Sequence, residues 1–270
     1  MILSSGPAST LASGWPGVLA SLLYAVAALR GDRVDRVAAL ALPCAWLAHL
    51  LALVFDIGGF GSQLEGARLG FAPVLSLTVW IVIGVHAVES RFVPLPAVRS
   101  WLAPAGLLVV ILAAFFPGDG HHFNSPWAPW HFVLGVGAYG LFGAAVLHAA
   151  LLDAAERRLR QKSAAAGLAP GMPLLQLERL TFRFVEVGFA VLSGALALGI
   201  VTTSQWRWDH KTVLSVLGWA VFAGLLTGRR LRGWRGRKAT RWLYVGAVLL
   251  LLAYVGSRFV FEVLLGRPQI

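Results

Sequence analysis

The sequence has 270 residues, of which 58% are hydrophobic and 13% charged, and its mean hydropathy is +0.74. A soluble domain of this length needs more polar surface, so the composition predicts an integral membrane protein. The net charge of +11 does not indicate a nucleic-acid partner, because the bases lie in short loops between apolar runs, as they do where they set membrane topology.

Apolar runs suited to crossing a membrane, which takes about 20 mostly apolar residues, occur eight times along the chain. The predicted spans are 15–29, 37–55, 71–88, 101–116, 131–152, 184–202, 212–227 and 242–265. The fold class is therefore all-α, a polytopic membrane protein with about eight transmembrane helices in one domain over 1–270. Residues 153–182 are predicted to form a connector that begins as a basic helical extension. Cys44, the single cysteine, is predicted to be a small core residue.

The charges of the loops alternate and predict the orientation of the chain. The loops after the first, third, fifth and seventh spans hold most of the bases, whereas the second holds Arg68, the fourth none, and the sixth Arg207 and Lys211. Lys and Arg favour the cytoplasmic side. Both termini are therefore predicted on the outer, periplasmic side and the connector 153–182 in the cytoplasm. The predicted location is the bacterial inner (cytoplasmic) membrane, with the lipid bilayer as a partner.

Histidines are the most informative polar residues of the sequence. His49 is predicted about 9 Å below the outer end of the second span, at a rise of 1.5 Å per residue. His131 begins the fifth span, and His210 precedes the seventh. Polar groups within a bilayer are rare and are functional candidates, but each histidine has an alternative as a core, interfacial or solvated residue. His86 and His148, near the inner ends of their spans, are predicted to be interfacial.

The loop WRWDHK, residues 206–211, combines several groups that can hold a flat, charged ligand. Trp206 and Trp208 offer flat apolar surface, and Arg207 and Lys211 offer positive charge. Asp209 can accept the second N–H of a ligating imidazole.

A haem needs this combination of groups. Imidazoles supply axial ligands, apolar side chains cover the macrocycle, and bases pair with the propionates. His49, His131 and His210 are the candidate ligands, and Arg258 is a further candidate for a propionate. Tryptophans near a membrane surface also have an alternative, as ordinary residues of the interfacial aromatic belt.

At these residues the sequence resembles a known family. WRWDHK is similar to the tryptophan-rich WxWDPKE segment of the CcsA/ResC/CcmC superfamily of cytochrome c assembly proteins, through Trp206, Trp208, Asp209 and Lys211. PWHFVLGVGAYGLFGAAVLHAALL resembles the family segment in which an outward histidine opens a helix, which implies an outer haem-ligand role for His131. The resemblance covers most of the chain, and it is closest to the short YpjD/HemX-like branch of inner-membrane proteins.

The chain also departs from the family pattern. His210 replaces the proline after Asp209, and Thr212 replaces the glutamate after Lys211. The family's second outer histidine is absent from the last helix, and His210 is a candidate replacement. These departures argue against full synthetase activity by this chain alone.

Two functional hypotheses follow. In the first, the chain is a haem-handling inner-membrane protein that binds or presents haem at the outer face in cytochrome c biogenesis. His131 and His210 would bind the haem iron, and the partner would be apocytochrome c or another membrane protein. Whether it is an enzyme stays open; at most it would be part of a haem-attachment system. The alternative is a non-enzymatic accessory or regulatory membrane protein that keeps the fold and has lost haem ligation. A transporter is disfavoured because the spans lack a paired-carboxylate relay.

Overall fold

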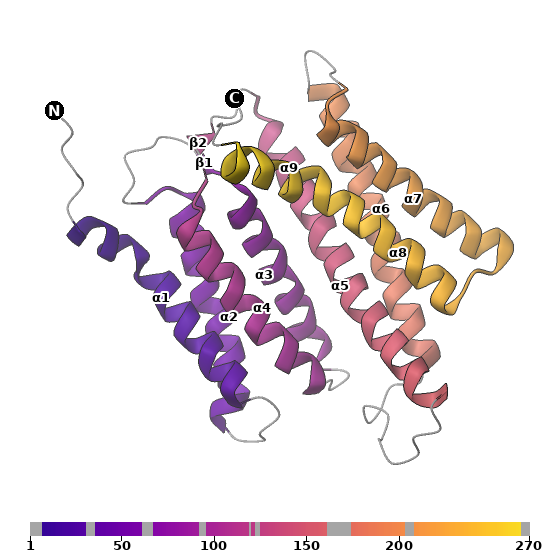
Figure 1. Cartoon of the computed structure of the whole chain (residues 1–270), viewed down its shortest axis with the longest axis horizontal. Helices are drawn as coiled ribbons and strands as arrows, with labels where there is room; N and C mark the ends of the chain where they lie inside the picture. The colour runs from indigo at the N-terminus through magenta and orange to yellow at the C-terminus, as the bar shows by residue number, and fades with distance from the viewer. Residues whose placement is uncertain are drawn as a thin grey trace. The chain divides into compact units, whose positions relative to one another are not determined.

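The computed structural model is a set of long helices joined by short connections (Figure 1). Contacts within the chain divide it into two compact units. Unit 1 comprises Met1–Arg91, Leu95–Phe123 and Phe261–Ile270, and unit 2 comprises Phe92–Pro94 and Asn124–Val260. Hydropathy alone did not reveal this division. The structure describes residues 7–30, 36–60, 67–91, 96–118, 120–121, 125–160, 174–202 and 208–265.

Unit 1 is built from four helices and a short strand pair. Strands β1 (Ala67–Arg68) and β2 (Gly120–His121) are antiparallel, with Ala67 opposite His121. A stacked tryptophan pair joins two of the helices. The ring centroids of Trp46 and Trp80 lie 4.6 Å apart, and each indole N–H donates to the backbone carbonyl of the other residue. The helices are α1 (Pro7–Arg30), α2 (Arg36–Ile57), α3 (Phe71–Glu89) and α4 (Pro96–Phe115).

Unit 2 is an up-and-down bundle of four helices (Figure 1). Its centre is a stacked pair, Phe142 and Phe222, with ring centroids 3.9 Å apart. Gly188 and Gly246 permit this packing, because a Cβ atom on either would lie within 3.2 Å of one of the rings. The helices are α5 (Ala128–Arg160), α6 (Leu174–Thr202), α7 (His210–Arg232) and α8 (Gly236–Leu251).

The last helix does not keep regular α geometry to its end. After α8 the chain continues through the π-helical turn η1 (Leu252–Gly256), α9 (Ser257–Phe259) and a second π-helical turn, η2 (Val260–Leu264). π-Helical turns are rare and occur frequently at functional sites. The Tyr139 hydroxyl of α5 donates to the Leu250 carbonyl at 2.5 Å, just before the first of these turns.

The all-α polytopic fold predicted from the sequence is confirmed. Within the described residues, seven helices are long and apolar enough to cross a membrane. Gly14–Arg30 is a shorter apolar stretch within α1; the whole helix has 24 residues, about 36 Å at 1.5 Å per residue, against a bilayer core of about 30 Å. The seven candidates and the apolar stretch within α1 correspond in order to the eight predicted spans. The orientation of the chain in the membrane stays a prediction.

Both ends of the predicted connector 153–182 are helical. Helix α5 continues to Arg160 and α6 begins at Leu174, so only 161–173, which lie outside the described residues, remain between them. The prediction gave the connector a basic helical start, but it began the sixth span only at residue 184, after the polar residues. Backbone hydrogen bonding does not stop at the membrane surface, however, and a helix can extend into water with its own backbone groups paired.

Candidate functional site

His131 lies in the first turn of α5, held by local and long-range hydrogen bonds. Its backbone N–H donates to the Trp127 carbonyl at 3.1 Å, and the Ala128 N–H donates to the Ser125 carbonyl at 3.1 Å. The exposed imidazole donates from Nδ1 to the Ala195 carbonyl of α6 at 2.8 Å. A neutral imidazole that donates from Nδ1 carries its lone pair on Nε2. The bond therefore orients the ring and leaves the lone pair of Nε2 available as an acceptor or a ligand.

Gly199 supports the His131 ring from α6. A Cβ atom at this position would lie 2.9 Å from Cε1 and 3.2 Å from Nδ1 of the imidazole. Real Cβ atoms do not approach ring atoms so closely, so any larger residue displaces the ring or the helix. The absence of a side chain at Gly199 is thus part of the geometry around His131.

Asp209 begins α7 as its N-cap. Its carboxylate Oδ1 accepts from the Thr212 backbone N–H at 2.8 Å, which satisfies a donor that the first turn leaves open. Partial burial raises the pKa of the Asp209 carboxyl, but the Thr212 hydrogen bond and the charges of Lys211 and His210 outweigh it and hold the pKa below its usual range. The cap fixes His210 and Lys211 in the first turn of α7. The structure gives this acid a capping role, and orientation of an imidazole by Asp209 stays a prediction.

Two cations flank one aromatic ring near the start of α7. Lys211 Nζ lies 5.7 Å and Arg258 Cζ 5.5 Å from the centroid of Tyr254, which belongs to the turn η1. Arg258 is buried, with 4% of its surface exposed. Such distances are typical of cation–π contacts. The ring therefore gathers two positive charges in one place.

Large aromatic side chains are exposed at the same end of unit 2. Trp127 and Trp130 are each 59% exposed, and Trp208 is 69% exposed. The starts of α5 and α7 and the end of α6 lie together at one end of the bundle (Figure 1). We call this region the histidine end; it is formed by residues 125–131, 195–202, 208–212 and 254–258.

His49 has a different environment, in the core of unit 1. It is 1% exposed, and both ring nitrogens have partners: Nδ1 lies 3.0 Å from the Tyr24 hydroxyl and Nε2 lies 2.8 Å from the Ser76 hydroxyl. These bonds join α1, α2 and α3. Ligation of a metal would break one of them, so this arrangement gives His49 a structural role, and the site proposed below does not include it.

The structure gathers most of the predicted site residues at the histidine end. His131, Trp208, Asp209, His210 and Lys211 lie there directly, and Arg258 joins them through Tyr254. Trp206 and Arg207 lie outside the described residues. Within the parts of the chain that the structure describes, no group of three or more His, Cys, Asp or Glu side chains could hold a metal ion.

Comparison with known proteins decides the family. The family model for cytochrome c assembly proteins matches residues 68–265. The chain belongs to this family. The match includes every helix of unit 2 and therefore the whole histidine end.

Several relatives are similar over most of their length. Inner membrane protein YpjD of Escherichia coli strain K12 is 30% identical over 238 residues, which cover 85% of this chain and 88% of that protein. A 28.8 kDa protein of Azospirillum brasilense is 34% identical over 76% of this chain and 69% of its own. The cytochrome c biogenesis protein CcsA of Prochlorococcus marinus is 23% identical over 68% of this chain and 70% of its own. No solved structure matches the chain.

Some residues of the site were not expected from the sequence. Gly199 and Tyr254 carried no signal that linked them to His131 or Lys211, because their contacts cross between helices. The capping role of Asp209 had a signal, since an acid directly before an apolar run is a common helix start. His86 and His148 are 3% and 1% exposed and so are covered by protein, while their predicted position at the membrane interface stays a prediction.

Proposed function

We propose that this protein binds haem at the histidine end of unit 2 and presents it during cytochrome c assembly in the bacterial inner membrane. The observation that carries the proposal is the hydrogen bond of His131. Its Nδ1 is bonded to the Ala195 carbonyl, and its Nε2 has no hydrogen-bond partner among the described residues. Histidines that ligate metals commonly donate their other N–H to a carbonyl or carboxylate, which orients the ring and raises its basicity. His131 is the proposed ligand of the haem iron.

His210 is the proposed second iron ligand. It is exposed, begins α7, and is placed by the Asp209 cap at the same end of unit 2. When bound, haem would supply an iron that the imidazoles of His131 and His210 can coordinate.

The side chains around the two histidines suit the porphyrin and the propionates of haem. Exposed Trp208 offers an apolar face to a macrocycle, and Trp127 and Trp130 are exposed at the same end. The cations beside Tyr254 and the loop residue Arg207 suit propionates, since charge-assisted hydrogen bonds to carboxylates are among the stronger ones in proteins. Lys211 and Arg258 are the proposed propionate partners.

The names of relatives support a role in cytochrome c assembly. CcsA of Prochlorococcus marinus is named a cytochrome c biogenesis protein, and YpjD an inner membrane protein. The natural receiver of presented haem is apocytochrome c, acting directly or through another membrane protein. In this proposal the chain holds and orients haem, and any attachment step requires that partner.

The test is an absorption spectrum of the full chain in detergent after haem is supplied. We expect a Soret band that remains after gel filtration in the wild type and is strongly reduced in the variant His131→Ala/His210→Ala. The control is Gln176→Ala, which truncates an exposed polar side chain of α6 and should leave the band unchanged. A folded wild-type protein that retains no haem would contradict the proposal and favour the accessory-protein alternative.

A further inference from the structure

The connection between α7 and α8 is the most basic segment of the chain. Residues 229–241 contain seven Lys or Arg residues and no acid. Six of these side chains are exposed: Arg230, Arg232, Arg235, Arg237, Lys238 and Arg241. Clustered bases beside a membrane span can set topology, but they also attract anionic lipid headgroups.

This connection has a fixed structure. Gly233 adopts a left-handed conformation, with φ at 62°, and ends α7. The Trp234 backbone N–H donates to the Gly228 carbonyl at 3.2 Å, and a Cβ atom on Gly228 would lie 2.5 Å from the Trp234 ring. The turn therefore folds closely back onto the last turn of α7, and its bases project from a defined backbone.

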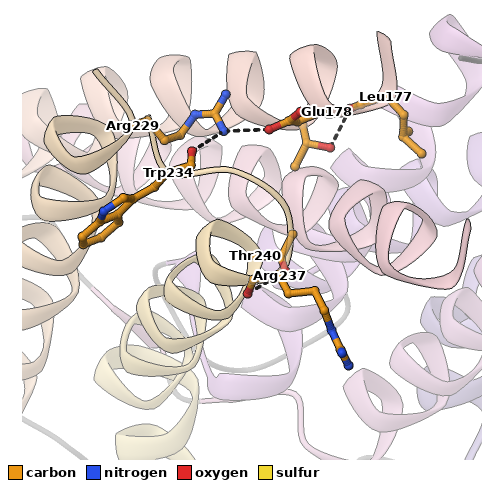
Figure 2. A network of polar contacts seen from close by, with 7 residues as sticks. Leu177, Glu178, Arg229, Trp234, Arg237 and Thr240 are labelled. Atoms are coloured by element: carbon orange, nitrogen blue, oxygen red, sulfur yellow. Dashed lines mark hydrogen bonds and ion pairs between the residues drawn. The ribbon is translucent and has the colours of Figure 1, made fainter. Parts of the chain in front are cut away.

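Arg229 fastens the turn to α6. Its guanidinium donates to Glu178 Oε1 at 3.1 Å and to the Trp234 carbonyl at 3.3 Å, as Figure 2 shows. It also lies 3.4 Å from the centroid of the Phe182 ring. One base of the segment is thus used for structure, and the same contact neutralises Glu178.

Helix α5 is joined to α8 by a second polar contact. The Thr240 and Tyr244 hydroxyls donate to the two carboxylate oxygens of Asp153, at 3.0 and 2.9 Å. The connection between α7 and α8 is therefore tied to both α5 and α6.

A pocket of about 580 Å³ lies between this turn and the facing ends of α5 and α6. Leu152, Leu174 and Leu175 form its apolar lining. Its polar lining comes from Glu156, Glu178, Arg235 and Arg237. Because Glu178 pairs with Arg229, the remaining charges are two guanidinium groups and one carboxylate.

The pocket lies where the apolar spans end. The candidate spans Ala128–Arg157, Leu174–Thr202 and Gly236–Leu264 each have an end beside it. Trp234 and Trp242 stack nearby with ring centroids 6.2 Å apart, and Lys238 Nζ lies 4.3 Å from the Trp234 ring. Tryptophans and lysines of this kind mark the level of lipid headgroups, so the pocket opens at headgroup depth.

We propose that this pocket binds the headgroup of an anionic phospholipid of the phosphatidylglycerol type. Arg235 and Arg237 are placed to bind the phosphodiester, since guanidinium groups suit phosphate oxygens. Glu156 approaches Gly236, whose Cβ position would lie 3.2 Å from Oε1. Its carboxylate is placed to accept from glycerol hydroxyls, and the three leucines to contact the acyl chains. Basic residues that only set membrane topology need no pocket. Here two bases, an acid and an apolar wall line one pocket, and they match the phosphate, the glycerol and the acyl chains of a lipid.

The variant Glu156→Gln separates this lipid from an ethanolamine phospholipid. An amide still accepts a hydrogen bond from a hydroxyl, so binding of phosphatidylglycerol should be kept or strengthened when the negative charge is removed. An ammonium headgroup would instead lose its ion-pair partner. Two results together would overturn the assignment to an anionic lipid. The wild type would bind phosphatidylethanolamine more tightly than phosphatidylglycerol, and Glu156→Gln would strongly weaken binding of phosphatidylethanolamine.

The experiment is native mass spectrometry of the delipidated full chain, titrated with dioleoylphosphatidylglycerol in detergent. The variant Arg235→Gln/Arg237→Gln should weaken binding of the first lipid about 30-fold, from two lost basic contacts. The matched control Arg230→Gln/Arg232→Gln removes the same charge outside the pocket and should change binding less than about threefold. Free glycerol phosphate should not displace the lipid, because it lacks acyl chains.

The control decides between a site and a diffuse basic surface. Equal weakening by the two double variants would overturn the pocket, as would unchanged binding in Arg235→Gln/Arg237→Gln. Displacement by free glycerol phosphate would assign the pocket to a soluble anion instead of a lipid. Only variants that elute from gel filtration at the same volume as the wild type are compared, so that a loss of lipid binding cannot be caused by a loss of fold.

Discussion

His49 of unit 1 and His131 of unit 2 are the same residue type in opposite environments. His49 is 1% exposed and has a hydroxyl partner on each ring nitrogen. His131 is exposed and uses Nδ1 for a carbonyl of the neighbouring helix. Depth in the membrane therefore does not identify a ligand. The partners of the two ring nitrogens separate a structural histidine from a candidate ligand.

The largest expected effect is on stability, from His49→Ala. The change leaves the Tyr24 and Ser76 hydroxyls without their buried partner and opens a cavity between three helices. We expect a loss of about 3 kcal/mol in the free energy of unfolding, measured by denaturation in detergent. The haem bound per folded protein should stay unchanged.

His131→Ala should show the reverse pattern. The side chain is exposed, so the free energy of unfolding should fall by about 1 kcal/mol or less, while haem retention should be strongly reduced. If His49→Ala removes the haem and leaves stability intact, the assignment of the two histidines is exchanged and the comparison fails.

A smaller effect is expected from Gly199→Ala, which sharpens the role of His131. The new Cβ atom would lie 2.9 Å from the imidazole, so the ring must shift from its bond with the Ala195 carbonyl. Changes in the groups that orient a ligand typically weaken metal binding by about tenfold or more, and we expect about tenfold here, from a haem titration followed by absorbance.

Gly194→Ala is the matched control on the same helix. Among the described residues, a Cβ atom at Gly194 meets only Leu134, at 4.0 Å, so haem affinity should stay at the wild-type value. Equal losses in both variants would point to a general effect of α6 packing and would remove Gly199 from the site.

The smallest effect concerns the Asp209 cap. Asp209→Ala should cost about 1 kcal/mol of α7 stability, measured as faster amide hydrogen exchange in its first turn. The pKa of Asp209 is lowered in the folded protein, so its stabilisation is complete above the unfolded value of about 3.9 and is lost as pH falls through the folded value. Asp209→Asn keeps a capping oxygen, and its first turn should therefore exchange at a rate that is less sensitive to acid. An equally acid-sensitive first turn in Asp209→Asn would show that another group is responsible.

Hydropathy predicted the helices well and their ends poorly. The third span, expected over 71–88, is Phe71–Glu89 in the structure, whereas α6 begins ten residues before the predicted 184. Apolar residues report contact with lipid, while a helix continues as long as its backbone is paired. The polar first turns of α6 were therefore assigned to a connector.

Packing faces were not predictable, because several spans are apolar on all sides. A helix of this kind gives no pattern that separates the lipid-facing side from the core. Cys44 was expected in the core and is exposed, while the burial of His86 and His148 against neighbouring helices was not expected.

The local parts of the site were visible in the sequence, and its long-range parts were not. His131 and the loop before α7 stood out by residue type. The contacts of His131 with Ala195 and Gly199, and of Lys211 with Tyr254, join residues more than 40 positions apart. Such contacts depend on how the helices of unit 2 pack, which a single sequence does not specify.

The most direct measurement is the absorption spectrum of the variant His131→Gly with haem, recorded with and without imidazole. The substitution removes the proposed ligand and leaves space at an exposed position in the first turn of α5. We predict that the Soret band of bound haem is lost and that added imidazole restores it by occupying the vacated position. A wild-type spectrum in the variant without imidazole would contradict the claim that His131 binds the iron.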